Sequence, residues 1–176
     1  LGGDRQLMND GIVELLPNHF GGTVDLIKMR EEQIVVMFNA SPMDEKGYFS
    51  LSLANAYVGG LLDVADKIII EVNENCPYTY GENHHVHIDD VTALIESNAP
   101  LPTIPEPVID EKSAAIGKLI ANLVPDGATL QIGYGSVPSA VMNNLSSKKH
   151  LGFHTEMLPD KAMELLHAGA LDNSKK

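Results

Sequence analysis

Cysteine and basic residues are both scarce in this sequence. Cys76 is the single cysteine, so an internal disulfide framework is excluded and a reducing, cytoplasmic environment is expected. Lys and Arg number 12 against 24 Asp and Glu, which gives a formal net charge of -12. An acidic surface repels phosphate backbones and anionic lipids, so neither nucleic acid nor membrane is expected as a partner. Local backbone dipoles can still hold one anionic ligand.

Long apolar runs are absent as well. No stretch reaches the roughly 18 residues that span a bilayer, and no basic segment followed by an apolar one opens the chain. Apolar types still make up 44% of the 176 residues, enough for a sizeable core. The chain starts at Leu1 and stops after Lys176 without a recognisable end, so we expect it to be part of a longer protein.

Proline is concentrated in one short stretch. Residues 98–107 (NAPLPTIPEP) hold four of the ten prolines. Because proline fixes φ and restricts the residue before it, this stretch is expected to run extended. We therefore predict a first α/β segment over 1–97, a linker over 98–107 and a second α/β segment over 108–176.

The first segment alternates strand and helix patterns. Apolar runs rich in β-branched residues predict buried strands over 34–38 and 67–72. A helix is predicted between them, over 54–65, despite the cost of Gly59 and Gly60. Strand, helix and strand in this order indicate a parallel crossover. The remaining predicted elements are strands over 48–53 and 86–88 and a helix over 90–97.

The second segment continues this pattern. Asp110 is expected to cap a helix that ends at Leu123. The apolar side chains of this helix form one stripe, at Ile116, Leu119, Ile120 and Leu123. A strand over 128–132 runs into the turn Gly133–Gly135, and Ser136 is expected to cap the next helix. That helix should reach about Leu145, followed by a strand over 153–157 and a helix over 160–168.

The strand, glycine turn and helix over 130–145 form the strongest candidate site. A Gly-x-Gly turn lets a ligand approach the backbone, and the helix behind it offers N–H groups that suit a phosphate or an oxyanion. The dinucleotide-binding fingerprint is incomplete, because Pro138 stands where the third glycine would fall. Taken alone, such a turn is more often a tight βα connection than a ligand site.

A carboxylate follows on the next predicted strand, in His154-Thr155-Glu156. Neighbouring parallel strands end at the same sheet edge, so Glu156 is expected near the glycine turn. A carboxylate beside backbone N–H donors can attack an acyl group while the donors stabilise the oxyanion. The alternative is that Glu156 is one solvated carboxylate among 24 acidic residues.

Two further groups of residues suggest chemistry only weakly. His85 and His87 would share one face of a strand, and imidazole is a common zinc ligand. No further ligands stand at metal-site spacing, so we interpret these histidines as solvated and expect no metal. Cys76 has no His or Asn partner at a fixed spacing, so a catalytic thiol is not expected.

Residues 130–157 (LQIGYGSVPSAVMNNLSSKKHLGFHTEM) resemble the active-site segment of the acetyl-CoA hydrolase/transferase family, of the 4-hydroxybutyrate (butyrate/acetate) CoA-transferase type. The resemblance continues through SPMDEKGYFSLS (41–52) and ADKIIIEVN (65–73) and covers nearly the whole chain in collinear order. It implies two NagB/RpiA/CoA-transferase-like α/β domains with mainly parallel sheets, only partly covered by this chain. Residues 1–97 would be the C-terminal part of the first domain and 108–176 the N-terminal part of the second.

The resemblance also implies CoA transfer between an acyl-CoA and a short carboxylate such as acetate, butyrate or 4-hydroxybutyrate. In the family, the glutamate at the position of Glu156 is the nucleophile and carries CoA as a glutamyl thioester. The CoA site would be lined by Gly133, Tyr134, Gly135, Ser136 and Val137. The Tyr134 N–H would be an oxyanion donor. Coenzyme A is expected as a co-substrate without a permanently bound cofactor. A homo-oligomer is expected because a partial sheet exposes apolar edges.

Two alternatives stay open at this point. Acyl-CoA hydrolysis differs only in whether water reaches the glutamyl thioester, and the sequence does not separate the two reactions. A non-catalytic α/β module, either a nucleotide binder or a structural fragment, would be favoured if Glu156 lay buried against a cation or far from Gly133.

Overall fold

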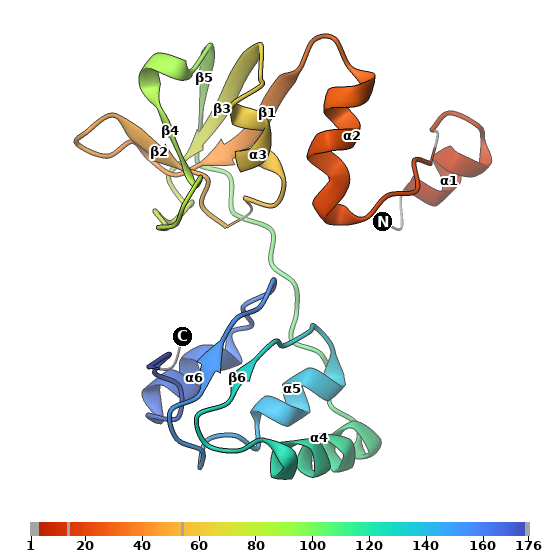
Figure 1. The fold of residues 1–176 in the computed structure, drawn as a ribbon, viewed down its shortest axis with the longest axis vertical. Helices are drawn as coiled ribbons and strands as arrows, with labels where there is room; N and C mark the ends of the chain where they lie inside the picture. Colours follow the sequence, from red (N-terminus) through yellow and green to blue (C-terminus); the bar gives the residue numbers. More distant parts are fainter. Residues whose placement is uncertain (1–3, 14, 54, 175–176) are drawn as a thin grey trace. The chain divides into compact units, whose positions relative to one another are not determined.

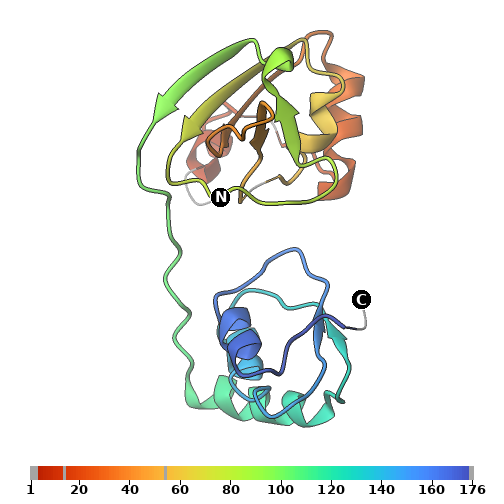
Figure 2. The ribbon, with the colours of Figure 1, turned by 90° about the vertical axis from the view of Figure 1, so that its left-hand side faces the viewer.

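The computed structural model describes residues 4–13, 15–53 and 55–174. The chain divides into two compact units, Leu1–Pro102 and Thr103–Lys176. Residues 98–110 contain no helix or strand, and the division falls inside this stretch (Figure 2). A separate cluster of buried apolar side chains lies within each unit, so each has its own core.

A parallel sheet with the strand order β1-β3-β5 forms the centre of the first unit (Figure 1). The apolar runs form β1 (Val35–Ala40) and β3 (Lys67–Asn73), which pair in parallel from Val35 opposite Lys67 onward. Between them, α3 (Val58–Leu62) packs against β1. The predicted α/β class with a mainly parallel sheet is thus confirmed.

A second, antiparallel pair of strands completes the core of this unit. In it, β2 (Tyr48–Ser50) pairs with β4 (His85–His87), and Phe49 lies opposite Val86. These two side chains are buried with Ala40, Ile68 and Ile70 from the parallel sheet. The other elements of the unit are α1 (Asp4–Asn9), η1 (Phe20–Gly22), α2 (Thr23–Arg30) and η2 (Ile88–Asp90).

Two predicted helices of the first unit differ from the structure. The helix expected over 90–97 is wrong, because β5 (Ala93–Ser97) forms there instead and pairs in parallel with β3. The Thr92 N–H donates to the Ile68 carbonyl at 2.8 Å, and the Thr92 Oγ1 accepts from the Ile68 N–H at 3.2 Å, which aligns the chain with the strand. The helix expected over 54–65 is shortened to α3, and Ala54 lies outside the described residues.

Tyr78 and Asp44 form a polar pair in the first unit that the sequence did not reveal. The Tyr78 hydroxyl donates to the Asp44 Oδ2 at 3.0 Å, while the Asp44 Oδ1 accepts from the Tyr48 N–H at 2.8 Å. The Tyr48 hydrogen bond is the largest factor that lowers the pKa of Asp44. Burial, followed by the hydrogen bond to Asp44, raises the pKa of Tyr78 to about 12.

We expect this pair to make the first unit sensitive to alkali. The unfolded pKa of Tyr78 is near 10.0 and the folded pKa about 12, so its contribution to stability is complete below pH 10 and is lost as the pH rises toward 12. Urea unfolding across this range should show the loss, and Tyr78→Phe should reduce it. Tyr57→Phe, at an exposed tyrosine of the same unit that is not among the groups that raise the pKa of Tyr78, is the matched control. An unchanged pH dependence in Tyr78→Phe would contradict the assignment.

The second unit contains a short parallel pair of strands with helices around it. The strands β6 (Thr129–Leu130) and β7 (Gly152–Phe153) place Leu130 opposite Phe153. Its helices are α4 (Glu111–Leu123), α5 (Ser136–Met142) and α6 (Lys161–His167). The core includes Met142, Leu145, Leu151, Phe153 and Leu165. Among the described residues, no helix has both the length and the apolar character that crossing a membrane requires.

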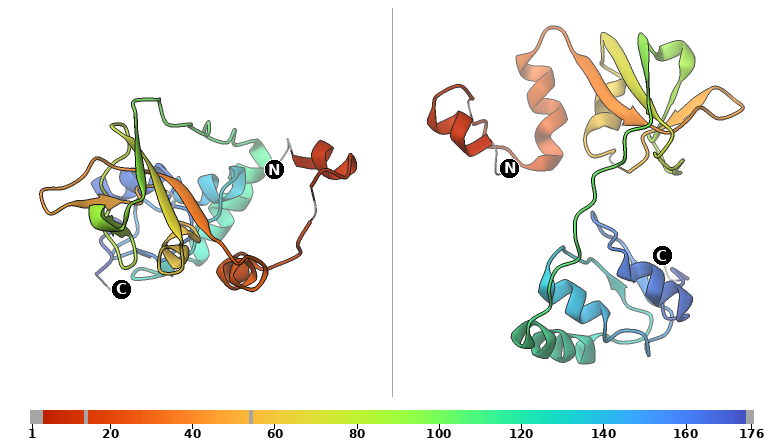
Figure 3. Two further views of the ribbon diagram at one scale, coloured as in Figure 1. Left: turned by 90° about the horizontal axis from the view of Figure 1, so that it is seen from above. Right: turned by 180° about the vertical axis from the view of Figure 1, so that it is seen from behind.

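The helix α4 buries a different face from the one that its apolar pattern predicts. Asp110 caps it as expected, and its Oδ1 accepts from the Ser113 N–H at 2.7 Å. The predicted stripe is exposed, by 43%, 67%, 38% and 82% at Ile116, Leu119, Ile120 and Leu123. The buried residues are Ser113, Gly117 and Ala121. These residues are small because α4 and α5 pack closely side by side (Figure 3).

Two further boundaries of the second unit are corrected. Gly135, not Ser136, is the residue that precedes α5, and the helix ends at Met142 rather than near Leu145. The Ser136 hydroxyl instead accepts a hydrogen bond from the Ser113 hydroxyl at 3.0 Å. The strand expected over 153–157 ends at Phe153, because the chain beyond it pairs through a side chain, as described below.

Candidate functional site

The glycine turn and the segment that carries Glu156 leave the same edge of the short sheet. Beyond β7, the His154 N–H donates to the Leu130 carbonyl at 3.0 Å. One residue further, the Thr155 Oγ1 accepts from the Ile132 N–H at 3.1 Å and donates to the Ile132 carbonyl at 2.8 Å. Beyond the end of β7, the Thr155 side chain thus makes the hydrogen bonds to Ile132 that the backbone of a longer strand would make. Gly133 and Glu156 follow directly on this linked pair.

We expect Thr155 to position this edge through both of its hydrogen bonds. In Thr155→Val, the shape of the side chain is retained but both bonds to Ile132 are lost, at about 1 kcal/mol each. Hydrogen exchange of the Ile132 amide should accelerate by about tenfold for each 1.4 kcal/mol lost. Thr155→Ser keeps the hydroxyl and is the control. Equal protection of the Ile132 amide in Thr155→Val and the unmodified chain would refute this role.

Glu156 is solvent-exposed at the end of this pair. Among the residues that the structure describes, its carboxylate has no hydrogen bond or ion pair. The carboxylate is therefore not buried against a cation, which was one of the two arrangements that would have favoured a non-catalytic module. An exposed, unpaired carboxylate is free to act as a nucleophile.

The glycine turn holds its backbone in a conformation that only glycine adopts readily. Gly135 has φ 139° and ψ 177°, a region that L side chains rarely occupy. Gly133 and Tyr134 are exposed, and the Tyr134 hydroxyl donates to the Pro105 carbonyl at 2.8 Å. This bond holds the Tyr134 side chain to the proline-rich stretch.

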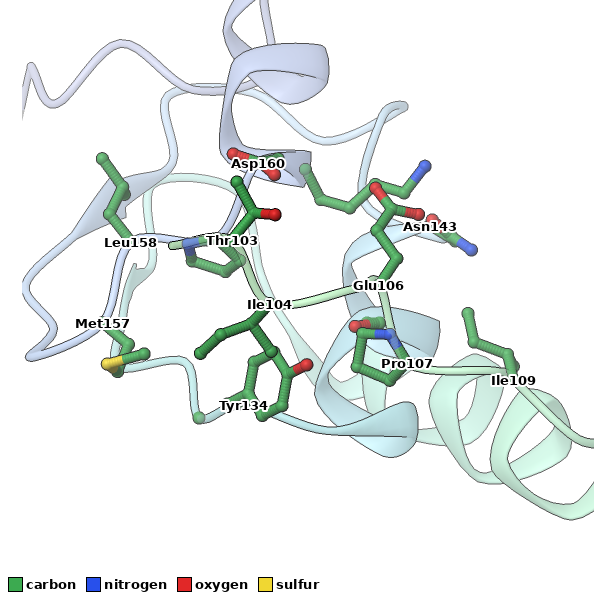
Figure 4. Close-up of a pocket in the computed structure, with 14 residues that line it drawn as sticks. Thr103, Ile104, Glu106, Pro107, Ile109, Tyr134, Asn143, Met157, Leu158 and Asp160 are labelled. Atoms are coloured by element: carbon green, nitrogen blue, oxygen red, sulfur yellow. The ribbon is translucent and has the colours of Figure 1, made fainter. Parts of the chain in front are cut away.

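A cavity of about 370 Å³ adjoins the turn within the second unit. Figure 4 shows around it Ile104 from the proline-rich stretch, Tyr134 from the turn and Met157 from the segment after β7. Of the predicted site residues, Gly133 and Tyr134 line this cavity. Val137 and Gly133 line a smaller neighbouring cavity of about 220 Å³. Gly135, Ser136 and Glu156 are not among the residues that line either one.

Charged residues that were not predicted from the sequence also line the larger cavity. Lys161 lies at its wall, and its Nζ is 2.8 Å from the Glu164 Oε1. The hydrogen bond to Glu164 raises the pKa of Lys161, and the nearby charge of Glu106 adds to the effect. For Glu106, the sequence indicated only an extended, proline-rich stretch. It did not indicate that this stretch would lie near Lys161.

The histidines of β4 bind protein carbonyls instead of forming a cluster. The His85 Nε2 lies 3.0 Å from the Thr79 carbonyl, and the His87 Nε2 lies 3.2 Å from the Lys46 carbonyl. Across the described part of the chain, no three His, Cys, Asp or Glu side chains come together in a way that would hold a metal ion.

Comparison with known proteins identifies a family. The family model of the acetyl-CoA hydrolase/transferase N-terminal domain matches residues 3–105. The chain is 39% identical to a succinyl-CoA:cyclohexane-1-carboxylate CoA transferase of Geobacter metallireducens and 36% identical to a 4-hydroxybutyrate coenzyme A transferase of Clostridium kluyveri, over 98% of its length in each case. It spans only 39% and 40% of those two proteins. Proteins called acetyl-CoA hydrolases match at 26% to 29% identity.

Solved structures give the same result. RipA from Yersinia pestis superposes with a TM-score of 0.88 at 34% identity, over 98% of this chain and 41% of RipA. A 4-hydroxybutyrate CoA-transferase from Porphyromonas gingivalis superposes with a TM-score of 0.85 at 30% identity, over 98% of this chain and 44% of the other. The resemblance predicted from residues 41–157 is confirmed.

Proposed function

The chain belongs to the acetyl-CoA hydrolase/transferase family, and on this basis we propose that it acts as part of a CoA-transferase that moves CoA from an acyl-CoA to a short carboxylate. The observation that carries the proposal is the collinear match, over 98% of the chain, to relatives named CoA transferases at 36% and 39% identity. The acceptors that we propose are acetate, butyrate or 4-hydroxybutyrate. Hydrolase relatives are less similar, so transfer is preferred to hydrolysis.

Glu156 is the nucleophile in this proposal. Its support is local: the carboxylate is exposed and unpaired among the described residues, and it follows Thr155, which is hydrogen-bonded to Ile132 immediately before the glycine turn. A carboxylate in this setting can approach an acyl group that is held at the turn.

The reaction would proceed in four balanced steps. The Glu156 carboxylate attacks the acyl-CoA carbonyl, which releases CoA thiolate and forms a mixed anhydride between Glu156 and the first acid. The thiolate then attacks the glutamyl carbonyl, which releases the first acid and forms a glutamyl-CoA thioester. The carboxylate of the second acid attacks this thioester, which releases CoA thiolate again and forms a second mixed anhydride. The thiolate finally attacks the new acyl carbonyl, which gives the second acyl-CoA and restores the carboxylate.

The turn would supply binding and electrostatic stabilisation. Coenzyme A is the proposed co-substrate, and the Tyr134 N–H is the proposed donor to the oxyanion that forms in each attack. Gly133 and Gly135 would let the thioester approach the backbone, since neither carries a side chain. Ser136 and Val137 belong to the same proposed site, Ser136 through its backbone because its hydroxyl already pairs with Ser113.

We place the two segments in larger domains. Residues 1–97 would be the C-terminal part of the first CoA-transferase domain, 98–107 the linker, and 108–176 the start of the second domain, which carries Glu156. Apolar side chains on the parallel sheet, such as Met37 at 66% and Ile95 at 53% exposure, support association with further chain or with another copy. The single cysteine supports a reducing, cytoplasmic setting.

A product assay on the full-length protein separates transfer from hydrolysis. Butyryl-CoA is incubated with and without acetate, and acetyl-CoA, butyrate and free CoA thiol are measured. Transfer requires acetate, forms acetyl-CoA and butyrate in equal amounts, and releases no free thiol. Release of free thiol at the same rate with and without acetate would instead assign hydrolysis.

A further inference from the structure

The centre of the glycine turn is not held by hydrogen bonds of its own backbone. Among the residues that the structure describes, the N–H and carbonyl groups of Gly133 and Tyr134 and the N–H of Gly135 have no hydrogen-bond partner. Before the turn, Ile132 is fixed by its two hydrogen bonds to Thr155. After it, the Gly135 carbonyl accepts a hydrogen bond from the first turn of α5. The backbone between these points is therefore held only at its two ends.

This backbone can change its conformation at little cost because a glycine stands on each side of Tyr134. Glycine occupies positive and negative φ about equally well, and Gly135 has φ 139°. A rotation at Gly133 or Gly135 turns the peptide planes between them, and with them the Tyr134 N–H. In the proposed reaction this N–H donates to an oxyanion, and such a donor is effective only when its direction is fixed beforehand.

The Tyr134 side chain supplies the restraint that the backbone of the turn lacks. Its hydroxyl donates to the Pro105 carbonyl at 2.8 Å, and across the described part of the chain it makes the only hydrogen bond at the centre of the turn. The accepting carbonyl is a firm anchor, because Pro105 and Pro107 both fix φ in this stretch. Figure 4 shows the Tyr134 ring beside Ile104, which precedes Pro105, at the wall of the larger cavity.

We propose that the Tyr134 hydroxyl is a positioning group for CoA transfer. By binding the Pro105 carbonyl, it holds the centre of the glycine turn and fixes the direction of the Tyr134 N–H. The proline-rich stretch then serves as the anchor of the site and not only as a linker. The reaction that is positioned rests on the proposed function, whereas the bond that carries the inference is a feature of the second unit itself.

Tyr134→Phe in the full-length protein removes this bond and retains the ring and the N–H. We expect kcat for transfer from butyryl-CoA to acetate to fall by about 3- to 10-fold, the factor that one hydrogen bond supplies. The KM for butyryl-CoA should stay within about twofold, because a donor that acts in the transition state contributes little to ground-state binding. Tyr80→Phe is the matched control, at a hydroxyl that has no hydrogen bond among the described residues, and should change neither constant.

Pro105→Ala tests whether the hydroxyl acts through a stiff anchor. The variant keeps the carbonyl but gives the stretch more conformational freedom, so kcat should fall when Tyr134 is present. In the Tyr134→Phe background the same substitution should have no further effect, because the bond that transmits it is already absent. Pro100→Ala is the control, since the Pro100 carbonyl accepts no hydrogen bond from any described residue. Additive losses from Tyr134→Phe and Pro105→Ala would show that the two residues act separately and would overturn the proposal.

The mobility of the turn gives a reading that does not depend on catalysis. In protein labelled with 15N-glycine, the order parameters of the Gly133 and Gly135 amides should fall in Tyr134→Phe, from about 0.85 to below about 0.6. The Gly117 amide, inside α4, should not change. Unchanged order parameters at both turn glycines, or an unchanged kcat in Tyr134→Phe, would overturn the proposal.

The outcomes for the hydroxyl and for the reaction are separable. Transfer at the normal rate by Tyr134→Phe would remove the role of the hydroxyl and leave the transferase standing. If the unmodified protein transfers no CoA but Tyr134→Phe makes the turn glycines mobile, the proposed reaction is refuted, while the hydroxyl is shown to hold the turn.

Discussion

Glu156→Gln in the full-length protein is expected to lower the rate of CoA transfer by about 10⁴-fold or more. Glutamine keeps the size and the exposed position of the side chain but has no carboxylate to attack the acyl-CoA or to carry CoA. Both halves of the reaction pass through this group, so no step survives its loss. Initial rates of acetyl-CoA formation from butyryl-CoA and acetate measure the effect.

Glu164→Gln is the matched control for this substitution. Glu164 is also a glutamate of the second unit, on α6, and its carboxylate pairs with Lys161 at 2.8 Å. We expect a small change in rate there, because an exposed ion pair contributes little. Comparable losses in the two variants, or transfer at more than about 1% of the normal rate in Glu156→Gln, would contradict the assignment of the nucleophile.

Gly117→Ala is expected to destabilise the second unit, by about 2 kcal/mol. A Cβ at this position would lie 2.5 Å from the Ala140 carbonyl carbon and 2.6 Å from the Ala140 Cβ, so α4 and α5 would have to separate. Intrinsic helix propensity predicts the opposite sign, because alanine favours a helix by about 1 kcal/mol over glycine. Since α5 begins directly after the glycine turn, the same variant should also weaken the site.

Urea unfolding of the second unit measures this change. Ala115→Gly, on the exposed side of α4, gives the propensity effect alone and should cost about 1 kcal/mol. The packing account requires that Gly117→Ala and Ala115→Gly both destabilise, although they exchange the same residues in opposite directions. A stabilised Gly117→Ala variant would show that the helices are not in close contact at Ala140.

Local sequence patterns correctly predicted several elements that depend little on distant contacts. The β-branched runs at 34–38 and 67–72 form β1 and β3, and β3 is the central strand of the parallel sheet, where an apolar run is typical. The burial predicted for 34–38 is only half correct, because β1 is an edge strand and leaves Val35 and Met37 exposed, by 52% and 66%. Asp110 caps α4 because a carboxylate accepts the free N–H groups of a first turn wherever the helix lies. The hydrogen bonds of His154 to Leu130 and of Thr155 to Ile132 agree with the common edge of parallel strands, from which Glu156 is predicted to lie near the glycine turn.

Tertiary contacts decided the elements that the sequence analysis missed. The segment 90–97 became a strand because Thr92 aligned it with Ile68. The small residues of α4, and not its apolar stripe, form the buried face, since close packing against α5 has room for Gly117 but not for a side chain as large as Leu119. The Ser52 hydroxyl is buried and has no hydrogen-bond partner among the described residues. The sequence did not indicate this, because burial and hydrogen-bond partners are properties of the folded chain.

Peptide mass mapping of the full-length protein shows whether Glu156 carries CoA covalently. The protein is incubated with acyl-CoA, treated with borohydride, digested and compared with an untreated sample. We expect a CoA-mass adduct on the peptide that contains Glu156 before borohydride, and conversion of that side chain to a primary alcohol after it. An adduct on any other residue, or none at Glu156 while transfer proceeds, would show that Glu156 is not the nucleophile.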